Sequence, residues 1–179
     1  MTRLILTLAV FSLASAQDDG KVENPDYKGW AGQKVGAWVA FTRVEETGGT
    51  NNEITVTVKL TVISPEKAVI DEMVESEVGG IKVVTHGIRA LPARIKKGTD
   101  SEGSKVESIA KGEEEIEIKA AKLKCAWVKM KVTVNDGPMT MKVWRHDTII
   151  GGTAKVVMNI EKPEKKNITM TATDWKAGD

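Results

Sequence analysis

Residues 53–63, EITVTVKLTVI, decide the fold, because polar and apolar side chains alternate without a break from Glu53 to Val62. The apolar side chains occupy the even positions: Ile54, Val56, Val58, Leu60 and Val62. Successive side chains of a β-strand point to opposite faces, so this spacing predicts a strand with one buried face and one wet face. Such strands are typical of antiparallel sheets. The run is longer than most strands, which favours a large, curved sheet.

The same alternation recurs on both sides of this run. Further strands are predicted at residues 36–44, 67–76, 80–87, 113–120, 122–134, 139–144, 153–160 and 167–175. The best helix signal is Asn24-Pro25, where Asn can cap a short helix and Pro can occupy its first position. The pattern predicts an all-β fold with about nine long antiparallel strands. We expect a curved sheet or half-barrel, with a β-sandwich as the alternative.

The first residues have the pattern of an export signal. Arg3 gives a positive start, residues 4–13 are apolar, and Ala14-Ser15-Ala16 matches a cleavage site. We therefore expect a signal peptide at 1–16, an N-terminal segment with a short helix at 17–34, and a single antiparallel β domain at 35–176. The mature protein is expected to be soluble and either periplasmic or extracellular. No later stretch is apolar enough for an integral membrane helix.

Two stretches depart from simple alternation. Residues 91–112 are polar and rich in Gly and Ser, which predicts a flexible polar loop. Within 122–134 the apolar residues move from odd to even positions, which predicts a β-bulge between Ala126 and Val128. Cys125 is the single cysteine of the chain and is predicted to be a buried apolar residue.

The charges balance. Removal of Arg3 with the signal peptide leaves 25 of the 26 basic residues, against 25 acidic ones. A neutral surface of mixed charges lacks the basic patch that is typical of nucleic-acid-binding proteins. The glutamates at 113, 115 and 117 share one strand face, which we interpret as solvated.

VWRHDTIIGG (143–152) contains the best catalytic candidate, His146 beside Asp147. Adjacent strand residues point to opposite sides, and no nucleophile motif accompanies the pair, so we predict a turn and no enzymatic activity. A hydrolase using His146 or His86 is the alternative. No metal-ligand spacing, phosphate loop or dinucleotide motif is present, so we expect neither a metal nor a cofactor.

Methionine is concentrated on the apolar strand faces of the C-terminal half. Met is flexible and can fit irregular apolar shapes, although an ordinary core is the alternative interpretation. Trp144 is expected to be exposed or at a rim, because its neighbours on that face are polar. The residues predicted to bind a ligand are Trp127, Met130, Met139, Met141, Trp144, Met158 and Met170.

Three segments together resemble a known kind of protein: YKGWAGQKVGAWVAF (27–41), GEEEIEIKAAKLKCAWVKM (112–130) and MKVWRHDTIIGGTAKVVM (141–158). Their order resembles small exported bacterial β-rich proteins of planctomycete type, of uncharacterised function. It also resembles, more remotely, the half-barrel of LolA-like periplasmic lipoprotein carriers. In those relatives a VW strand and a Gly/Pro turn lead into a strand that begins with a small residue and Lys. The corresponding positions here are Val143, Trp144, Gly151, Gly152 and Lys155.

This resemblance implies a long antiparallel sheet around an apolar cavity, with an apolar small molecule or acyl chain as cargo. Such carriers have helices that plug the concave face, whereas this chain offers one short candidate. We therefore expect an exported, non-enzymatic binding protein for an apolar or lipid-like ligand. The alternative is a structural or adhesive β-module, without a ligand cavity, that binds an envelope protein.

Overall fold

The computed structural model describes residues 20–100, 104–134, 137–161 and 165–178, so the predicted signal peptide at 1–16 lies outside the described residues. Nine strands form one antiparallel sheet in the order β5-β4-β3-β2-β11-β10-β9-β8-β7. They are β2 (Trp38–Thr47), β3 (Thr50–Ile63), β4 (Lys67–Val78), β5 (Ile81–Pro92), β7 (Lys105–Ile118), β8 (Ala121–Val134), β9 (Gly137–Arg145), β10 (Thr153–Ile160) and β11 (Lys166–Lys176). The predicted all-β fold with one curved antiparallel sheet is confirmed, and the sheet is continuous rather than split into the two layers of a sandwich.

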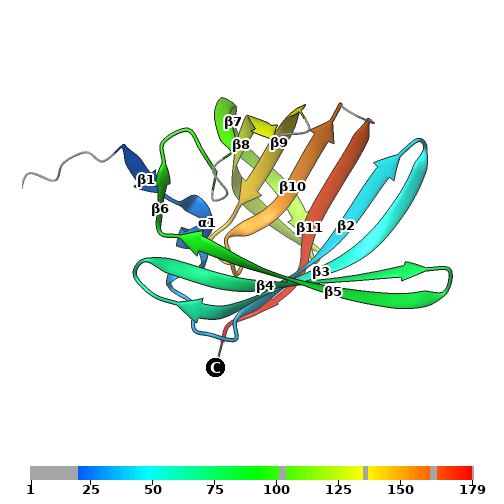
Figure 1. Cartoon of the computed structure of the whole chain (residues 1–179), viewed down its shortest axis with the longest axis horizontal. Coiled ribbons are helices and arrows are strands. Elements are labelled where there is room, and N and C mark those ends of the chain that lie inside the picture. Colours follow the sequence, from blue (N-terminus) through cyan, green and yellow to red (C-terminus); the bar gives the residue numbers. More distant parts are fainter. Residues whose placement is uncertain (1–19, 101–103, 135–136, 162–164, 179) are drawn as a thin grey trace, which may run out of the picture.

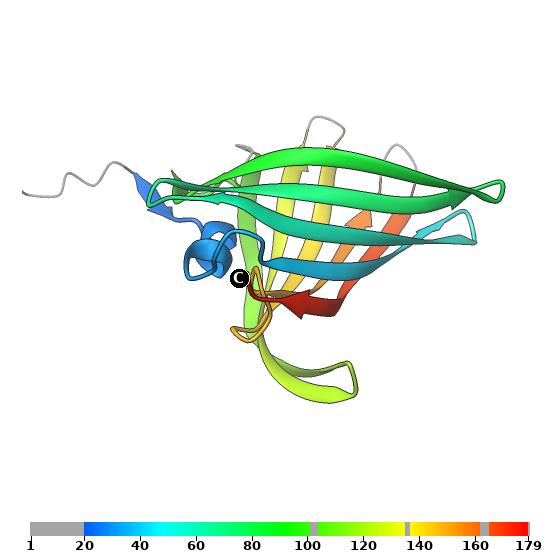
Figure 2. The ribbon, with the colours of Figure 1, turned by 90° about the horizontal axis from the view of Figure 1, so that it is seen from below.

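The sheet consists of two consecutive meanders. Strands β2–β5 form the N-terminal wing and strands β7–β11 form the C-terminal wing, and the wings join where β2 pairs with β11. The sheet curves strongly, so the wings stand at a large angle to one another (Figures 1 and 2). We call the side enclosed by the two wings the concave face and the opposite side the convex face.

The alternation in residues 53–63 determines which side of β3 is buried. Ile54, Val56, Val58 and Leu60 are buried on the concave face, as predicted. Val62 is 45% exposed, so its predicted burial is wrong. The pairing of β3 with β4 shifts between Leu60 and Val62, and this irregularity turns Val62 away from the core.

The prediction of a polar loop at 91–112 is wrong for most of that range. β5 continues to Pro92, β6 (Arg94–Lys96) pairs with β1 (Lys21–Glu23) in a small second sheet, and β7 begins at Lys105. The first half of β7 lies at the edge of the large sheet and is mostly exposed, so it needs no regular apolar face. Its register also shifts between Ser108 and Ala110, which interrupts the alternation.

The predicted bulge near Ala126–Val128 is also wrong. β8 pairs with β9 from Ala126 to Val134 without a register shift. The apolar residues move from odd to even positions because β8 is covered on its convex face at one end and on its concave face at the other. Cys125 is fully buried on the convex side, and Val132 is buried on the concave side. The predicted burial of Cys125 is confirmed, and burial raises the pKa of its thiol.

The predicted short helix is α1 (Pro25–Ala31), which lies at one end of the concavity (Figures 1 and 2). Asn24 caps it by accepting a hydrogen bond from the amide of Asp26, and the Asn24 side chain donates to the carbonyl of Pro92 at 2.7 Å. The buried Trp30 ring packs over Gly151, where a Cβ atom would lie 2.8 Å from the ring. A Cβ on Gly29 would lie 2.2 Å from the carbonyl oxygen of Gly151, so only glycine permits this approach.

Within the described residues, none of the helical structure is long and apolar enough to cross a bilayer.

Candidate apolar binding face

The central feature of the C-terminal wing is a row of methionines across its concave face. Met130 of β8 lies directly opposite Met141 of β9, and Met141 lies directly opposite Met158 of β10. The row continues to Ile168 of β11, which pairs with Met158. Residues directly opposite one another in an antiparallel sheet share a face, so the sequence-predicted methionines form a continuous apolar surface.

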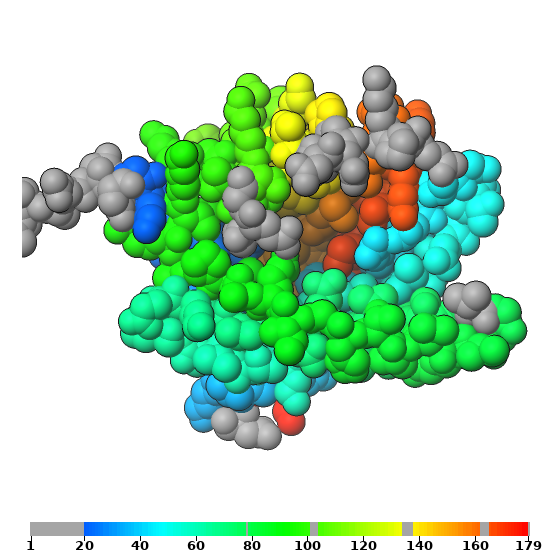
Figure 3. Space-filling model, viewed as in Figure 1, coloured from blue at the N-terminus to red at the C-terminus, as the bar shows by residue number. Residues whose placement is uncertain are grey.

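Two further rows flank the first one. Met139 lies between Val132 and Ile160 in one row, and Met170 lies opposite Val156 in the other. All five methionines of this wing are half-buried, so part of each side chain remains accessible. Figure 3 shows the molecule hollowed between the β4–β5 hairpin and the C-terminal wing, with atoms of β10 and β11 at the floor of the hollow.

The two predicted tryptophans lie on the other side of the sheet. Trp127 and Trp144 are directly opposite one another on the convex face, so the structure does not bring them together with the methionines. Trp144 is 6% exposed, and the expectation that it lies exposed or at a rim is wrong. The Nζ atom of Lys142 lies 4.2 Å from the centroids of both indole rings, and this polar neighbour covers the rings instead of leaving them open.

Glu114 completes this tryptophan–lysine arrangement. Its Oε2 accepts hydrogen bonds from Lys142 Nζ at 2.6 Å and from Trp144 Nε1 at 3.1 Å. These two hydrogen bonds, with the positive charges of Lys142 and Lys155, hold the pKa of the Glu114 carboxyl below its ordinary value. The donors and acceptors of the group satisfy one another, which indicates a structural role on the convex face.

The tip of the β7–β8 hairpin covers part of the convex face. The hairpin curls beneath the C-terminal wing (Figure 2). Lys119 and Ala120 form its two-residue turn with positive φ angles of 52° and 60°. Lys119 forms an ion pair with Asp174, and its Nζ atom lies 4.7 Å from the centroid of the Trp175 ring. The C-terminal wing therefore has apolar side chains on both faces, and the hairpin tip lies on the convex side (Figure 2).

The solvated glutamate face predicted on β7 is observed. Glu113, Glu115 and Glu117 are exposed, and the first two form ion pairs with Lys124 and Lys122 of β8.

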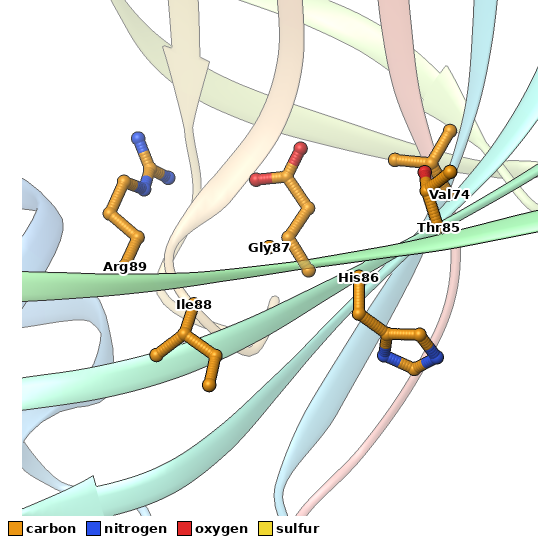
Figure 4. Close-up of a pocket in the computed structure, with 7 residues that line it drawn as sticks. Val74, Thr85, His86, Gly87, Ile88 and Arg89 are labelled. Carbon is orange, nitrogen blue, oxygen red and sulfur yellow. The ribbon is translucent and has the colours of Figure 1, made fainter.

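The N-terminal wing presents a different concave surface. Its central residues are fully buried, whereas strand β5 at the edge is exposed from Ile81 to Ala90. A groove of about 370 Å³ lies along the paired strands β4 and β5. Its lining residues are Glu72, Val74, Thr85, His86, Gly87, Ile88 and Arg89. Gly87 lies opposite Glu72, so no side chain fills the position beside that carboxylate. Val74, Thr85 and Arg89 point to one side of β5, and His86 and Ile88 point to the other (Figure 4).

One charged cluster lies on the concave face, where the wings join. Arg43 and Glu45 of β2 form an ion pair, and Lys166 of β11 forms a second ion pair with the same carboxylate. Burial opposes ionisation of Glu45, but the hydrogen bonds and positive charges of Lys166 and Arg43 outweigh it and lower the pKa of this carboxyl. Sequence reasoning missed this cluster. The available signal was that the alternation of Val39 and Phe41 continues through Arg43 and Glu45 onto the same face.

Neither of the catalytic candidates, His146 and His86, belongs to the methionine rows, and His86 is among the residues that line the β4–β5 groove. His146 belongs to the predicted turn between β9 and β10, where its Nδ1 lies 2.8 Å from Oγ1 of Thr148. His86 is exposed, and its Nδ1 lies 3.2 Å from Oδ1 of Asp71. In the described ranges, no three His, Cys, Asp or Glu side chains are grouped so that they could hold a metal ion.

No protein-family model matches the chain, and no curated protein matches it significantly. The solved structures that are similar to it include the following two. One is a Bacteroides fragilis protein with a YmcC-like fold, at a TM-score of 0.40 and 10% identity, covering 80% of this chain and 97% of that one. The other is a DUF1329 family protein from Desulfovibrio piger, at a TM-score of 0.36 and 6% identity, covering 86% of this chain and 93% of that one.

Proposed function

We propose that this chain is an exported, non-enzymatic binding protein that holds an apolar or lipid-like ligand against the concave face of its C-terminal wing. The observation that carries the proposal is the uninterrupted row Met130–Met141–Met158, in which every side chain is half-buried. A methionine row that served only as core would be expected to be buried as completely as Leu60 is in the N-terminal wing. Flexible thioether side chains at an accessible surface suit apolar ligands of variable shape.

The second candidate is a structural or adhesive β-module that binds an envelope protein. It is favoured by strand β5, an exposed edge strand on which Ile81 and Ile88 are 69% and 81% exposed. An exposed edge can accept a strand from another chain. This candidate predicts that removal of the concave methionine side chains leaves binding to the partner intact.

Export follows from the pattern of residues 1–16. N-terminal sequencing of the protein recovered from its host should begin at Gln17. A chain that still begins at Met1 would remove this part of the proposal.

A displacement titration tests the ligand. The purified protein is titrated with N-phenyl-1-naphthylamine, and the bound dye is displaced by fatty acids of increasing length. Burial of a methylene contributes about 0.8 kcal/mol, so each two-carbon extension should tighten binding by roughly tenfold until the apolar face is filled. Affinity independent of chain length, or no saturable binding by folded protein, would contradict the proposal.

Variants locate the binding surface. Met141→Glu places a charge in the centre of the methionine row and should abolish dye binding. Met73→Glu is the matched control, because Met73 is also half-buried on a strand but lies on the convex face of the N-terminal wing, opposite Thr57. Equal loss in the two variants would point to general unfolding and not to a local site, so far-UV circular dichroism accompanies both titrations.

A further inference from the structure

The Arg43–Glu45–Lys166 cluster carries a net charge of +1, counted as two cations and one carboxylate. The cations are its more accessible part: the side chains of Arg43 and Lys166 are 26% and 31% exposed, whereas Glu45 is 14% exposed. The Nε atom of Arg43 is buried and lacks a hydrogen-bond partner. The guanidinium and ammonium groups therefore have donor capacity beyond what the single carboxylate takes up.

The cluster lies directly beside the methionine rows. Arg43 is opposite Met170, and Glu45 is opposite Ile168, the residue that ends the row Met130–Met141–Met158. A partly buried net positive charge beside apolar rows costs free energy unless an anion balances it. That cost is unexplained if the cluster serves only to stabilise the sheet, because an apolar trio would fill the same positions without it.

The spacing of the strands gives the distance from the far end of the methionine rows to the charged cluster. Four interstrand spacings separate β8 from β2, which corresponds to about 19 Å at ~4.8 Å per spacing. An extended aliphatic tail that lay across β8–β11 would therefore have one end at Arg43 and Lys166.

We propose that the ligand is an anionic amphiphile whose tail lies on the methionine rows and whose carboxylate or phosphate head group accepts hydrogen bonds from Arg43 and Lys166. This inference rests on the proposed function and adds the charge and orientation of the ligand to it. Glu45 holds the two cations in place and limits their attraction for the head group. Its removal should therefore strengthen binding of an anion, an effect opposite in sign to removal of either cation.

The test compares two probes of equal tail length, dodecanoate and dodecanol, by displacement of N-phenyl-1-naphthylamine at neutral pH. Arg43→Met and Lys166→Met keep an unbranched, flexible side chain at each position and remove its charge. Each should weaken dodecanoate binding by about tenfold or more, because hydrogen bonds to charged groups are involved, and should leave dodecanol binding unchanged. Glu45→Gln should tighten dodecanoate binding and leave dodecanol binding unchanged.

Lys59→Met is the matched control, because Lys59 is an exposed lysine on the convex side of β3. It should alter neither affinity. A second pair of probes separates a free anion from an amphiphile. Inorganic phosphate alone should not displace the dye, whereas dodecyl phosphate should.

The outcomes separate the two proposals. If both probes bind and the three cluster variants change both affinities equally, the head-group site is wrong and the proposed function stands. If neither probe binds the folded wild-type protein, the proposed function fails and this inference fails with it. A Glu45→Gln variant that weakens dodecanoate binding would also overturn the head-group assignment, since its fold is checked by circular dichroism beforehand.

Discussion

The two wings of the sheet follow the same two-residue alternation but differ in how their concave faces are filled. In the N-terminal wing the face is made of branched and aromatic side chains, with Leu60 at 0% exposure and Val56 and Ile70 at 1% each. In the C-terminal wing five concave positions carry half-buried methionines, interspersed with branched residues such as the buried Val132 and Ile168. Branched side chains have few rotamers and pack into one fixed arrangement, whereas methionine adapts to what it contacts. Under the proposed function, the first wing supplies stability and the second wing binds the ligand.

Truncation of one residue in each wing tests that division. Leu60→Ala should lower the free energy of unfolding by about 2–5 kcal/mol, because it leaves a cavity in a filled core. Met141→Ala should cost less, about 1–2 kcal/mol, because the side chain is already half-accessible. Urea unfolding followed by circular dichroism measures both. Equal losses would show that the methionine row is ordinary core.

The contact that holds α1 at the end of the concavity offers a second test. Gly29→Ala forces a methyl group against the carbonyl of Gly151, and we expect a loss of about 1–3 kcal/mol in the free energy of unfolding. Gly32→Ala is the control, because a Cβ at Gly32 would meet nothing within 4 Å, and it should lower the free energy of unfolding by less. An unchanged free energy of unfolding in Gly29→Ala would mean that α1 does not approach Gly151 as described.

The turn of the β7–β8 hairpin provides a test of the convex side of the C-terminal wing. Ala120 has a φ of 60°, a conformation that costs an L-residue about 1–2 kcal/mol, and glycine adopts it freely. Ala120→Gly should therefore raise the free energy of unfolding by about 0.5–1 kcal/mol. Lys119→Gly should gain less, since it also removes the ion pair with Asp174. The reverse order would contradict the structural role given to the hairpin tip.

Acid titration examines the junction between the wings. The folded-state pKa of Glu45 is lowered below its ordinary value of 4.5, so the unfolded chain takes up the proton first as the pH falls. The stabilisation by Glu45 is thus complete above pH 4.5 and is lost as the pH falls through the lowered folded-state pKa. Glu45→Gln should be less stable than the wild type at neutral pH, and the gap should close in acid. Melting temperatures over this range measure the gap, with the exposed Glu53→Gln as control; a gap independent of pH would be inconsistent with the ion pairs.

Much of this architecture could be predicted from the sequence. All nine strands of the large sheet overlap the predicted ones, because alternation such as that of Ile54 to Leu60 reports directly on burial. The cap at Asn24-Pro25 likewise located α1. These are local signals, which depend on few neighbours.

The failures have a common physical origin in tertiary context. The edge strand β7 is stabilised by its main-chain ladder with β8 and carries little apolar pattern in residues 105–112. Trp144 is buried because Lys142 and Glu114 cover it from neighbouring positions, which no alternation within one strand reveals. For the candidate site, the methionines could be assigned to one face in advance, but the placement of Arg43 beside Lys166 depends on the pairing of β2 with β11, two strands at opposite ends of the chain.

The most direct test of the central claim is methyl NMR of the protein labelled with ¹³C at the methionine methyl groups, titrated with a spin-labelled fatty acid. The account predicts selective paramagnetic broadening of five concave signals and none of the signal of Met73 on the convex face. The five are Met130, Met139, Met141, Met158 and Met170. Broadening of Met73 to the same degree, or unchanged spectra at saturating fatty acid, would contradict it.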